Sequence, residues 1–196
     1  MRANMSVRAW AGSKAEFMVA APSGWEALHD VAKRLKSSAN ASARDLPAML
    51  FFTDPVRTPR PWAIAEGLPR GSGVVFRAFG AADAVPTGLR LADICRAQGL
   101  VLLAGADAGL AEAIGAGGVH LPERLAGAAL ALRAARADWL LTLAAHGAAG
   151  LSAAVAGIDA CVLSPVFESS SPSAGAPLGV SRFAALVRAC TVPVYA

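Results

Sequence analysis

Three kinds of side chain in this sequence could act on a phosphorylated small molecule, and each comes near the end of a short apolar run. Arg77 and His146 each stand near the end of such a run, and Ser169 and Ser171 belong to a hydroxyl-rich loop after a third. A guanidinium can hold a phosphate through two hydrogen bonds, and hydroxyls donate to phosphate oxygens. An imidazole exchanges protons near neutral pH. Together, these residue types suit phosphate binding combined with a proton transfer.

The loop after Leu163 carries the densest pattern of this kind. The run that ends there predicts a buried strand, the hydroxyls of residues 169–171 follow, and Pro-Leu-Gly at 177–179 leads into an expected helix. Such a loop can hold a phosphate, because backbone N–H groups and a helix N-terminus attract anions. An ordinary Ser/Gly/Pro loop without a ligand would have the same composition, so both interpretations stay open.

Each ionisable candidate also has an ordinary structural alternative. Arg77 could form an ion pair at the end of its strand, and His146 could hydrogen-bond to a neighbouring loop. We expect His120, inside an apolar run, to be mainly structural. The three histidines and three cysteines lack zinc-type spacing, so the sequence predicts no such metal site.

Apolar runs and helical patterns alternate from residue 48 onward. Strands are expected at 48–53, 73–78, 100–104, 117–121, 139–144, 159–163 and 193–196. Helices are expected at 61–68, 87–98, 107–115, 123–136, 148–156 and 181–190. Thr87 can cap the second of these helices, and Gly99 suits its C-terminal end. Since the strands are unbroken apolar runs, they favour a parallel sheet covered by helices. Their number suits a (β/α)8 barrel better than a flat doubly wound sheet.

The residues before this region form an extension. Residues 1–24 show no clear period, and a linker is expected at 37–43. Between them, Trp25 to Lys36 predicts an amphipathic helix with an apolar stripe of Trp25, Leu28, Val31, Ala32 and Leu35. We therefore divide the chain into an N-terminal extension with one helix, 1–46, and a barrel domain, 47–196.

The composition argues against several classes of function. No stretch of about 18 uninterrupted apolar residues occurs, so a membrane-spanning helix is not expected. The net charge of +4 is scattered without a dense basic run, so nucleic-acid binding is not expected. A positive charge suits anionic small molecules. The three widely spaced cysteines indicate buried thiols in a reducing, cytoplasmic environment.

Several segments, in the right order, resemble one known family. Residues 164–179 are similar to the Gly-Pro-Val-Phe-x-Thr-x-Thr-Lys and Pro-Leu-Gly signature of the thiamine phosphate synthase/TenI superfamily. Residues 49–54 and 73–77 resemble its first two strands, and residues 110–121 resemble a segment that ends in Gly-Val-His-Leu. The resemblance covers about residues 47–196 and implies a TIM-type (β/α)8 barrel and a role in thiamine biosynthesis.

The resemblance also implies roles for the candidate residues. Arg77 matches an arginine that contacts phosphate, although Val75 and Phe79 stand where the family has Gln and Lys. Ser169 and Ser171 stand in place of two threonines and keep the hydroxyls, while a neighbouring lysine of the family is lost.

His146 and the segment Val-Phe-Glu at 166–168 match the TenI branch, which resembles a thiazole tautomerase. A histidine at that position moves a proton on a thiazole phosphate carboxylate. The favoured expectation is therefore a metal-free, TenI-like tautomerase with His146 as its catalytic residue, no cofactor, and a phosphorylated small molecule as its ligand.

Two other functions stay open. A Mg²⁺-dependent thiamine phosphate synthase would join a pyrimidine pyrophosphate to a thiazole phosphate, but its acidic metal ligands are missing at the matching positions. Asp107 and Glu123 lie next to those positions, where a shifted metal site stays open, but we favour a role for both in capping or charging helix N-termini. The third function is a non-catalytic paralogue that binds a phosphorylated ligand or regulates. The true substrate stays open in each case.

The resembled barrel continues past the equivalent of Ala196 with one more strand and further helices. Without them, the first and seventh strands would have unpaired edges, which favour aggregation. We therefore expect a longer natural reading frame or a partner chain over the gap, and a homo-oligomer stays open.

Overall fold

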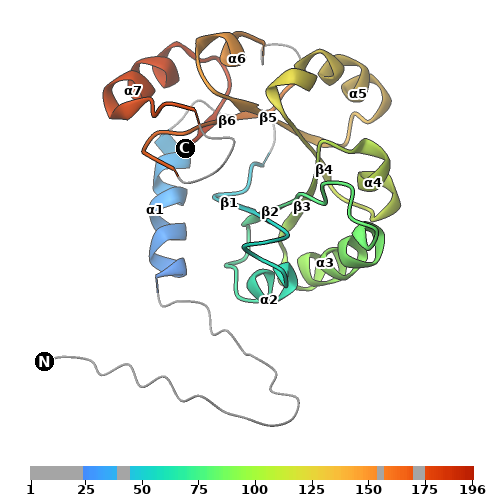
Figure 1. Cartoon of the computed structure of the whole chain (residues 1–196). Coiled ribbons are helices and arrows are strands. Elements are labelled where there is room, and N and C mark those ends of the chain that lie inside the picture. Colours follow the sequence, from blue (N-terminus) through green and yellow to red (C-terminus); the bar gives the residue numbers. More distant parts are fainter. Residues whose placement is uncertain (1–23, 39–44, 154–156, 170–174) are drawn as a thin grey trace, which may run out of the picture.

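Seven parallel strands lie side by side in the order of the chain and curl into an open barrel (Figure 1). The computed structural model describes residues 24–38, 45–153, 157–169 and 175–196. Its strands are β1 (Leu50–Phe52), β2 (Gly73–Phe76), β3 (Val101–Gly105), β4 (Gly118–Leu121), β5 (Leu140–Ala145), β6 (Ala160–Leu163) and β7 (Val194–Tyr195). Each strand pairs in parallel with the next, and each overlaps the range that the sequence predicts.

Helices follow the strands and lie around the outside of the curled sheet (Figure 1). They are α2 (Pro61–Ala65), α3 (Ala84–Gln98), α4 (Ala108–Ala113), the 3-10 helix η1 (Glu123–Ala128), α5 (Ala129–Ala135), α6 (Ala148–Ala153) and α7 (Gly179–Ala189). The α/β, TIM-type architecture expected from the sequence is confirmed. Among the described helices, none is both long enough and apolar enough to cross a membrane.

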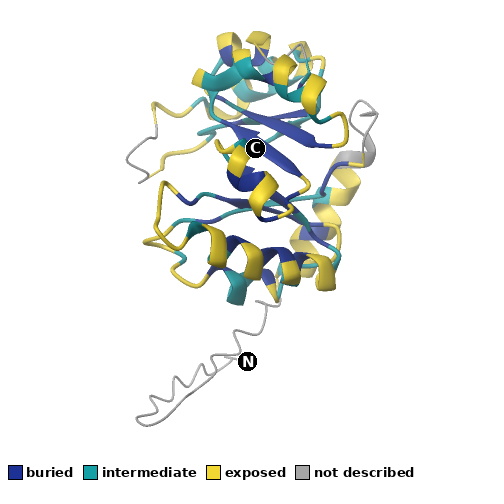
Figure 2. Cartoon of the chain, turned by 90° about the vertical axis from the view of Figure 1, so that its right-hand side faces the viewer, coloured by how far each residue is buried: buried dark blue, intermediate teal, exposed yellow. Residues whose placement is uncertain are grey.

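Both faces of the sheet are buried, which explains the unbroken apolar strands. Side chains alternate between the two faces along a strand. One set packs beneath the helices and includes Val74, Leu102, Val119 and Leu141. The other set forms a separate cluster inside the barrel and includes Val75, Leu103, Leu140 and Ala160. Figure 2 shows the buried strands between helices whose outer faces are exposed.

Two helices differ from the expected pattern. Thr87, expected to cap a helix, lies inside α3, which begins at Ala84. Pro86 fits the first turn, because its missing N–H would have no helical partner there. Gly99 ends α3 in the left-handed conformation, with φ of 68°, as expected. The expected helix 123–136 divides into η1 and α5, and Gly127 weakens an α-helix at that point.

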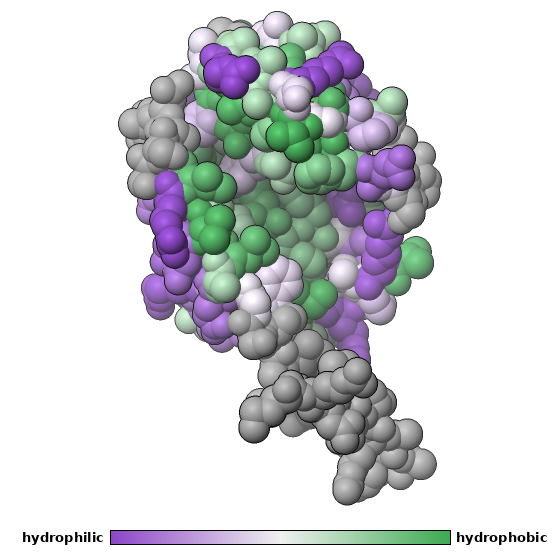
Figure 3. Space-filling view, turned by 90° about the vertical axis from the view of Figure 1, so that its left-hand side faces the viewer, coloured by the Kyte–Doolittle hydropathy of each residue, from purple (hydrophilic) through white to green (hydrophobic). Residues whose placement is uncertain are grey.

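The helix in the extension, α1 (Trp25–Ser38), buries a face that only partly overlaps the one expected. Leu28, Val31 and Leu35 of the apolar stripe are 54%, 49% and 65% exposed, whereas His29 is buried. The other two residues of the stripe, Trp25 and Ala32, are half-buried, and Trp25 packs against the core. Figure 3, which faces the side of the molecule that carries α1, shows hydrophobic surface around a central hollow. The helical period therefore predicted the helix but not the face that contacts the barrel.

Candidate functional site

Arg77 and His146 lie at the same end of the barrel. In a parallel sheet of this kind, all C-terminal strand ends meet at one rim. Arg77 directly follows β2, and His146 directly follows β5. Three strand spacings of about 4.8 Å separate β2 from β5, or about 14 Å along the sheet. Ser169 is exposed in the loop after β6, and Ser171 lies outside the described residues.

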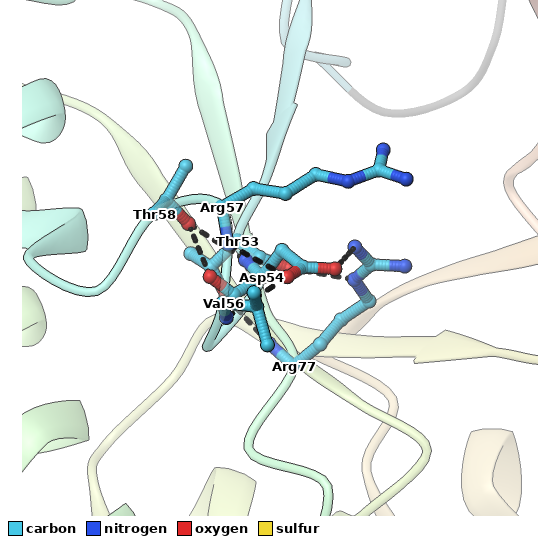
Figure 4. Close-up of polar contacts among 6 residues, drawn as sticks. All are labelled: Thr53, Asp54, Val56, Arg57, Thr58 and Arg77. Atoms are coloured by element: carbon cyan, nitrogen blue, oxygen red, sulfur yellow. Dashed lines mark hydrogen bonds and ion pairs between the residues drawn. The ribbon is translucent and has the colours of Figure 1, made fainter. Parts of the chain in front are cut away.

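The loop after β1 holds Arg77 in position (Figure 4). The Arg77 backbone N–H donates to the Thr53 hydroxyl at 2.9 Å, and Nε donates to the Thr53 carbonyl at 2.7 Å. Nη2 faces Asp54 Oδ2 at 3.4 Å. The sequence left open an ion pair for Arg77, and the structure contains it. Its partner, Asp54, lies 23 residues earlier in the chain.

Arg77 is a partly buried cation between two aromatic rings. Its guanidinium carbon lies 5.8 Å from the ring centre of Phe52 and 5.3 Å from that of Phe79. Burial is the main cause that lowers the pKa of Arg77, and the charge of Arg57 lowers that pKa further, while Asp54 raises it. Phe79 itself has a left-handed backbone, with φ of 50°, and a side chain that is 71% exposed. Strain of this kind in a non-glycine residue concentrates at functional sites.

The turn after β1 is closed by hydrogen bonds of Asp54. Its Oδ1 accepts from the backbone N–H groups of Val56 and Arg57, at 3.0 Å each. These bonds, chiefly that from Arg57, lower the pKa of Asp54. The turn places the Arg57 side chain next to Arg77, an arrangement that the sequence analysis missed. An Asp-Pro turn directly after a strand was the available signal.

His146 is exposed, and its backbone and ring are both hydrogen-bonded. The backbone N–H donates to Glu123 Oε2 at 2.9 Å, and Nδ1 lies 2.8 Å from the Ser164 carbonyl oxygen. A carbonyl oxygen can only accept, so Nδ1 carries a proton in this contact. The neutral ring then has its lone pair on Nε2, which has no hydrogen-bond partner among the described residues. The sequence left open a hydrogen bond from His146 to a neighbouring loop, and the structure contains it. Because this bond uses Nδ1, Nε2 is available to a ligand.

Asp107 and Glu123 both accept hydrogen bonds from backbone N–H groups. Asp107 caps α4 through a bond from Leu110 at 2.8 Å, as expected. Glu123 reaches the N–H of His146, just before α6. Gly150 leaves room for this carboxylate, because a Cβ there would lie 2.7 Å from it. In the described ranges, no three His, Cys, Asp or Glu side chains form a group that could hold a metal ion.

His120 lies inside the barrel and is buried. Its Nδ1 is 2.9 Å from the Thr142 hydroxyl, and its ring meets the Phe52 ring edge-on at 5.0 Å between centres. Burial, with a smaller contribution from the charge of Arg77, lowers the pKa of His120 to about 4. The imidazole is therefore neutral near pH 7.

Comparison with known proteins identifies the family. A family model described as "Thiamine monophosphate synthase", TMP-TENI, matches residues 65–196. The chain belongs to this family. The match confirms the superfamily expected from residues 49–54 and 164–179. It does not separate the synthase branch from the TenI branch.

One protein similar in sequence and two similar in structure stand beside this match. A Geobacter sulfurreducens protein named "Putative thiamine-phosphate synthase" is 38% identical over 89 residues, which are 44% of this chain and 42% of that protein. A thiamine phosphate pyrophosphorylase structure from Pyrococcus furiosus has a TM-score of 0.62 at 17% identity, covering 74% of this chain and 72% of that one. A variant of the citrate synthase SbnG has a TM-score of 0.50 at 16% identity, covering 83% and 79%. At such identities, the two structures show the fold alone.

Proposed function

We propose that this family member binds a thiazole phosphate at the barrel rim and shifts a proton on it without a metal or other cofactor, as a TenI-like tautomerase. Arg77, Ser169 and Ser171 bind the phosphate, and His146 is the acid and base. The observation that carries the proposal is the orientation of His146, whose Nδ1 faces the Ser164 carbonyl.

The hydrogen bonds of His146 suit it to proton transfer. The Ser164 carbonyl keeps a proton on Nδ1, so Nε2 of the neutral ring can take one from the ligand. Glu123 fixes the backbone of the same residue. In the reaction, Nε2 takes a proton from one atom of the thiazole and returns it to another. No bond to another group breaks, and no oxidant or reductant is needed. A positioned imidazole works well near neutral pH.

The test follows the interconversion of thiazole phosphate tautomers by NMR. His146→Ala removes the acid–base group but not the phosphate ligands, so we expect turnover to fall about 10²–10⁴-fold while the dissociation constant stays within several-fold. Arg77→Ala should do the opposite and weaken binding first. An unchanged rate in His146→Ala would contradict the catalytic role. A parent protein that binds the ligand without turnover would favour the non-catalytic paralogue.

A Mg²⁺-dependent synthase is the second candidate, because the family model and the Geobacter sulfurreducens relative are both named as synthases. A Mg²⁺ site needs oxygen ligands, whereas Asp107 and Glu123 already accept backbone hydrogen bonds. We therefore propose that ligand binding does not depend on Mg²⁺. Titration with a pyrimidine pyrophosphate, with and without Mg²⁺, is the check. Tight binding that needs Mg²⁺ and disappears in Asp107→Ala would favour the synthase.

A further inference from the structure

Arg57 provides a second guanidinium next to that of Arg77 (Figure 4). The two side chains come from the loops after β1 and β2, and their guanidinium groups extend in the same direction. The electrostatics agree, since the charge of Arg57 contributes to the lowered pKa of Arg77. In the part of the chain that the structure describes, the Arg57 guanidinium has no hydrogen-bond or ion-pair partner.

Asp54 only partly neutralises these two cations. Its Oδ1 already accepts two backbone N–H groups, and its Oδ2 faces Arg77 Nη2 at 3.4 Å. Charge-assisted hydrogen bonds are shorter, at about 2.7–2.9 Å. One carboxylate beside two guanidiniums leaves a net positive charge, and the two like charges repel each other. An anion bound between the guanidiniums would remove this repulsion.

We propose that Arg57 and Arg77 together bind the phosphate of a phosphate monoester, while Asp54 holds Arg77 in place when no ligand is bound. The identity of the monoester as a thiazole phosphate rests on the proposed function. Binding of the phosphate group itself does not, and the family resemblance assigns no role to Arg57.

The turn that carries Arg57 is closed by hydrogen bonds within the chain. The Thr58 N–H and hydroxyl donate to the Asp54 carbonyl at 2.7 Å and 2.9 Å, and the Asp54 N–H donates to the Thr58 hydroxyl at 2.7 Å. Arg77 is held in turn by Thr53. Binding therefore orders only side chains, which lowers the entropy that a ligand would otherwise have to offset.

Calorimetric titration of the full chain with inorganic phosphate, thiazole phosphate and the unphosphorylated thiazole alcohol tests the proposal. Arg57→Gln should weaken binding of both phosphate compounds about 10- to 100-fold, because a hydrogen bond to a charged group is lost. Binding of the alcohol should not change. Arg60→Gln, which removes the same charge three residues further along, is the matched control and should stay within about twofold.

Asp54→Asn should strengthen phosphate binding, whereas Arg57→Gln should weaken it. The amide oxygen can still accept from Val56 and Arg57, so the turn is kept, while the negative charge that competes with the phosphate is removed. We expect phosphate to bind about three- to tenfold more tightly. A residue that only supported the loop could not strengthen binding when it is replaced.

The outcomes of these titrations distinguish failure of the two-arginine site from failure of the proposed function. If phosphate binding depends on Arg57 but no tautomerisation occurs, the phosphate site stands and the proposed function falls. If Arg57→Gln binds phosphate like the parent, or Arg60→Gln is equally weakened, the two-arginine site is overturned. Failure of the parent to bind any phosphate compound would overturn it too.

Discussion

At the scale of single residues, the barrel interior keeps one histidine neutral. His120 hydrogen-bonds to Thr142, packs against Phe52, and lies close enough to Arg77 for that charge to lower its pKa. Protonation would place a second cation in this interior, where charged groups are costly. The folded protein therefore binds a proton at His120 more weakly than the unfolded chain does.

We predict that this histidine makes the fold acid-sensitive. Its pKa is 6.5 in the unfolded chain and about 4 in the folded one, so the unfolded state binds more protons between these values. Stability falls with decreasing pH across this window, by about 3 kcal/mol in total. Urea unfolding at pH 7, 5.5 and 4.5 measures the decline.

The control for this prediction is His120→Gln, which keeps a hydrogen-bonding side chain and cannot titrate. The variant should lose less stability than the parent between pH 7 and 4.5. His29, whose pKa burial also lowers, is unchanged in the variant, so the difference between the two proteins isolates His120. Equal pH dependence in both would show that His120 does not cause the decline.

At the scale of elements, one ion pair joins α5 to the start of β6 and to β5. Arg133 Nη2 lies 2.6 Å from Asp159 Oδ2, which also accepts the Leu141 N–H at 2.8 Å. Arg133 further donates to the carbonyls of Trp139 and Gly157. Both charged side chains are mostly buried, at 22% and 13% exposed, so removal of either leaves polar groups unsatisfied.

We predict that Asp159→Ala lowers the free energy of unfolding by about 2–4 kcal/mol, because it leaves the Arg133 charge without its partner in a partly buried position. The matched control is Asp93→Ala. Asp93 pairs with Arg96 on the exposed side of α3, where both side chains are more than 70% exposed. That loss should stay below about 1 kcal/mol. Similar losses in the two variants, measured by urea unfolding, would refute the special role of Asp159.

At the scale of the whole molecule, the first and last strands of the sheet do not pair with each other in the described structure. The Tyr195 side chain connects the two ends of the sheet. The Tyr195 hydroxyl on β7 donates to the carbonyl of Pro47, just before β1, at 2.7 Å. Burial is the main cause that raises the pKa of this hydroxyl, and the charge of Asp45 raises it further.

We predict that Tyr195, the only tyrosine in the sequence, ionises only when the barrel unfolds. In the unfolded chain the pKa of Tyr195 is 10.0, and in the folded protein it is higher. The protonated hydroxyl therefore makes its full contribution to the free energy of unfolding below pH 10, and this contribution declines above pH 10. Tyrosinate absorbance should therefore rise together with the loss of circular dichroism, and not earlier. Tyr195→Phe should cost about 1 kcal/mol at pH 7. Titration near pH 10 in the folded protein would disprove the contact.

The sequence by itself determined the elements and their class. Unbroken apolar runs separated by helical periods predicted seven parallel strands, and Gly99 and Asp107 marked a helix end and a helix start. These features depend on residues a few positions apart, so local patterns are enough to find them. The apolar run at 73–78 likewise placed Arg77 near a strand end.

Only the tertiary structure decided which distant residues meet. Glu123 binds the backbone of His146, and the turn after β1 brings Arg57 to Arg77. The same holds for α1, which buries His29 and exposes Leu28, Val31 and Leu35 of its apolar stripe. Contacts across 20 or more residues depend on the curl of the sheet and on the exact turns of its loops. The curl and the turns leave no periodic signal in the sequence. The hydrophobic period shows which face of an element is apolar, but it does not show which residues lie opposite that face.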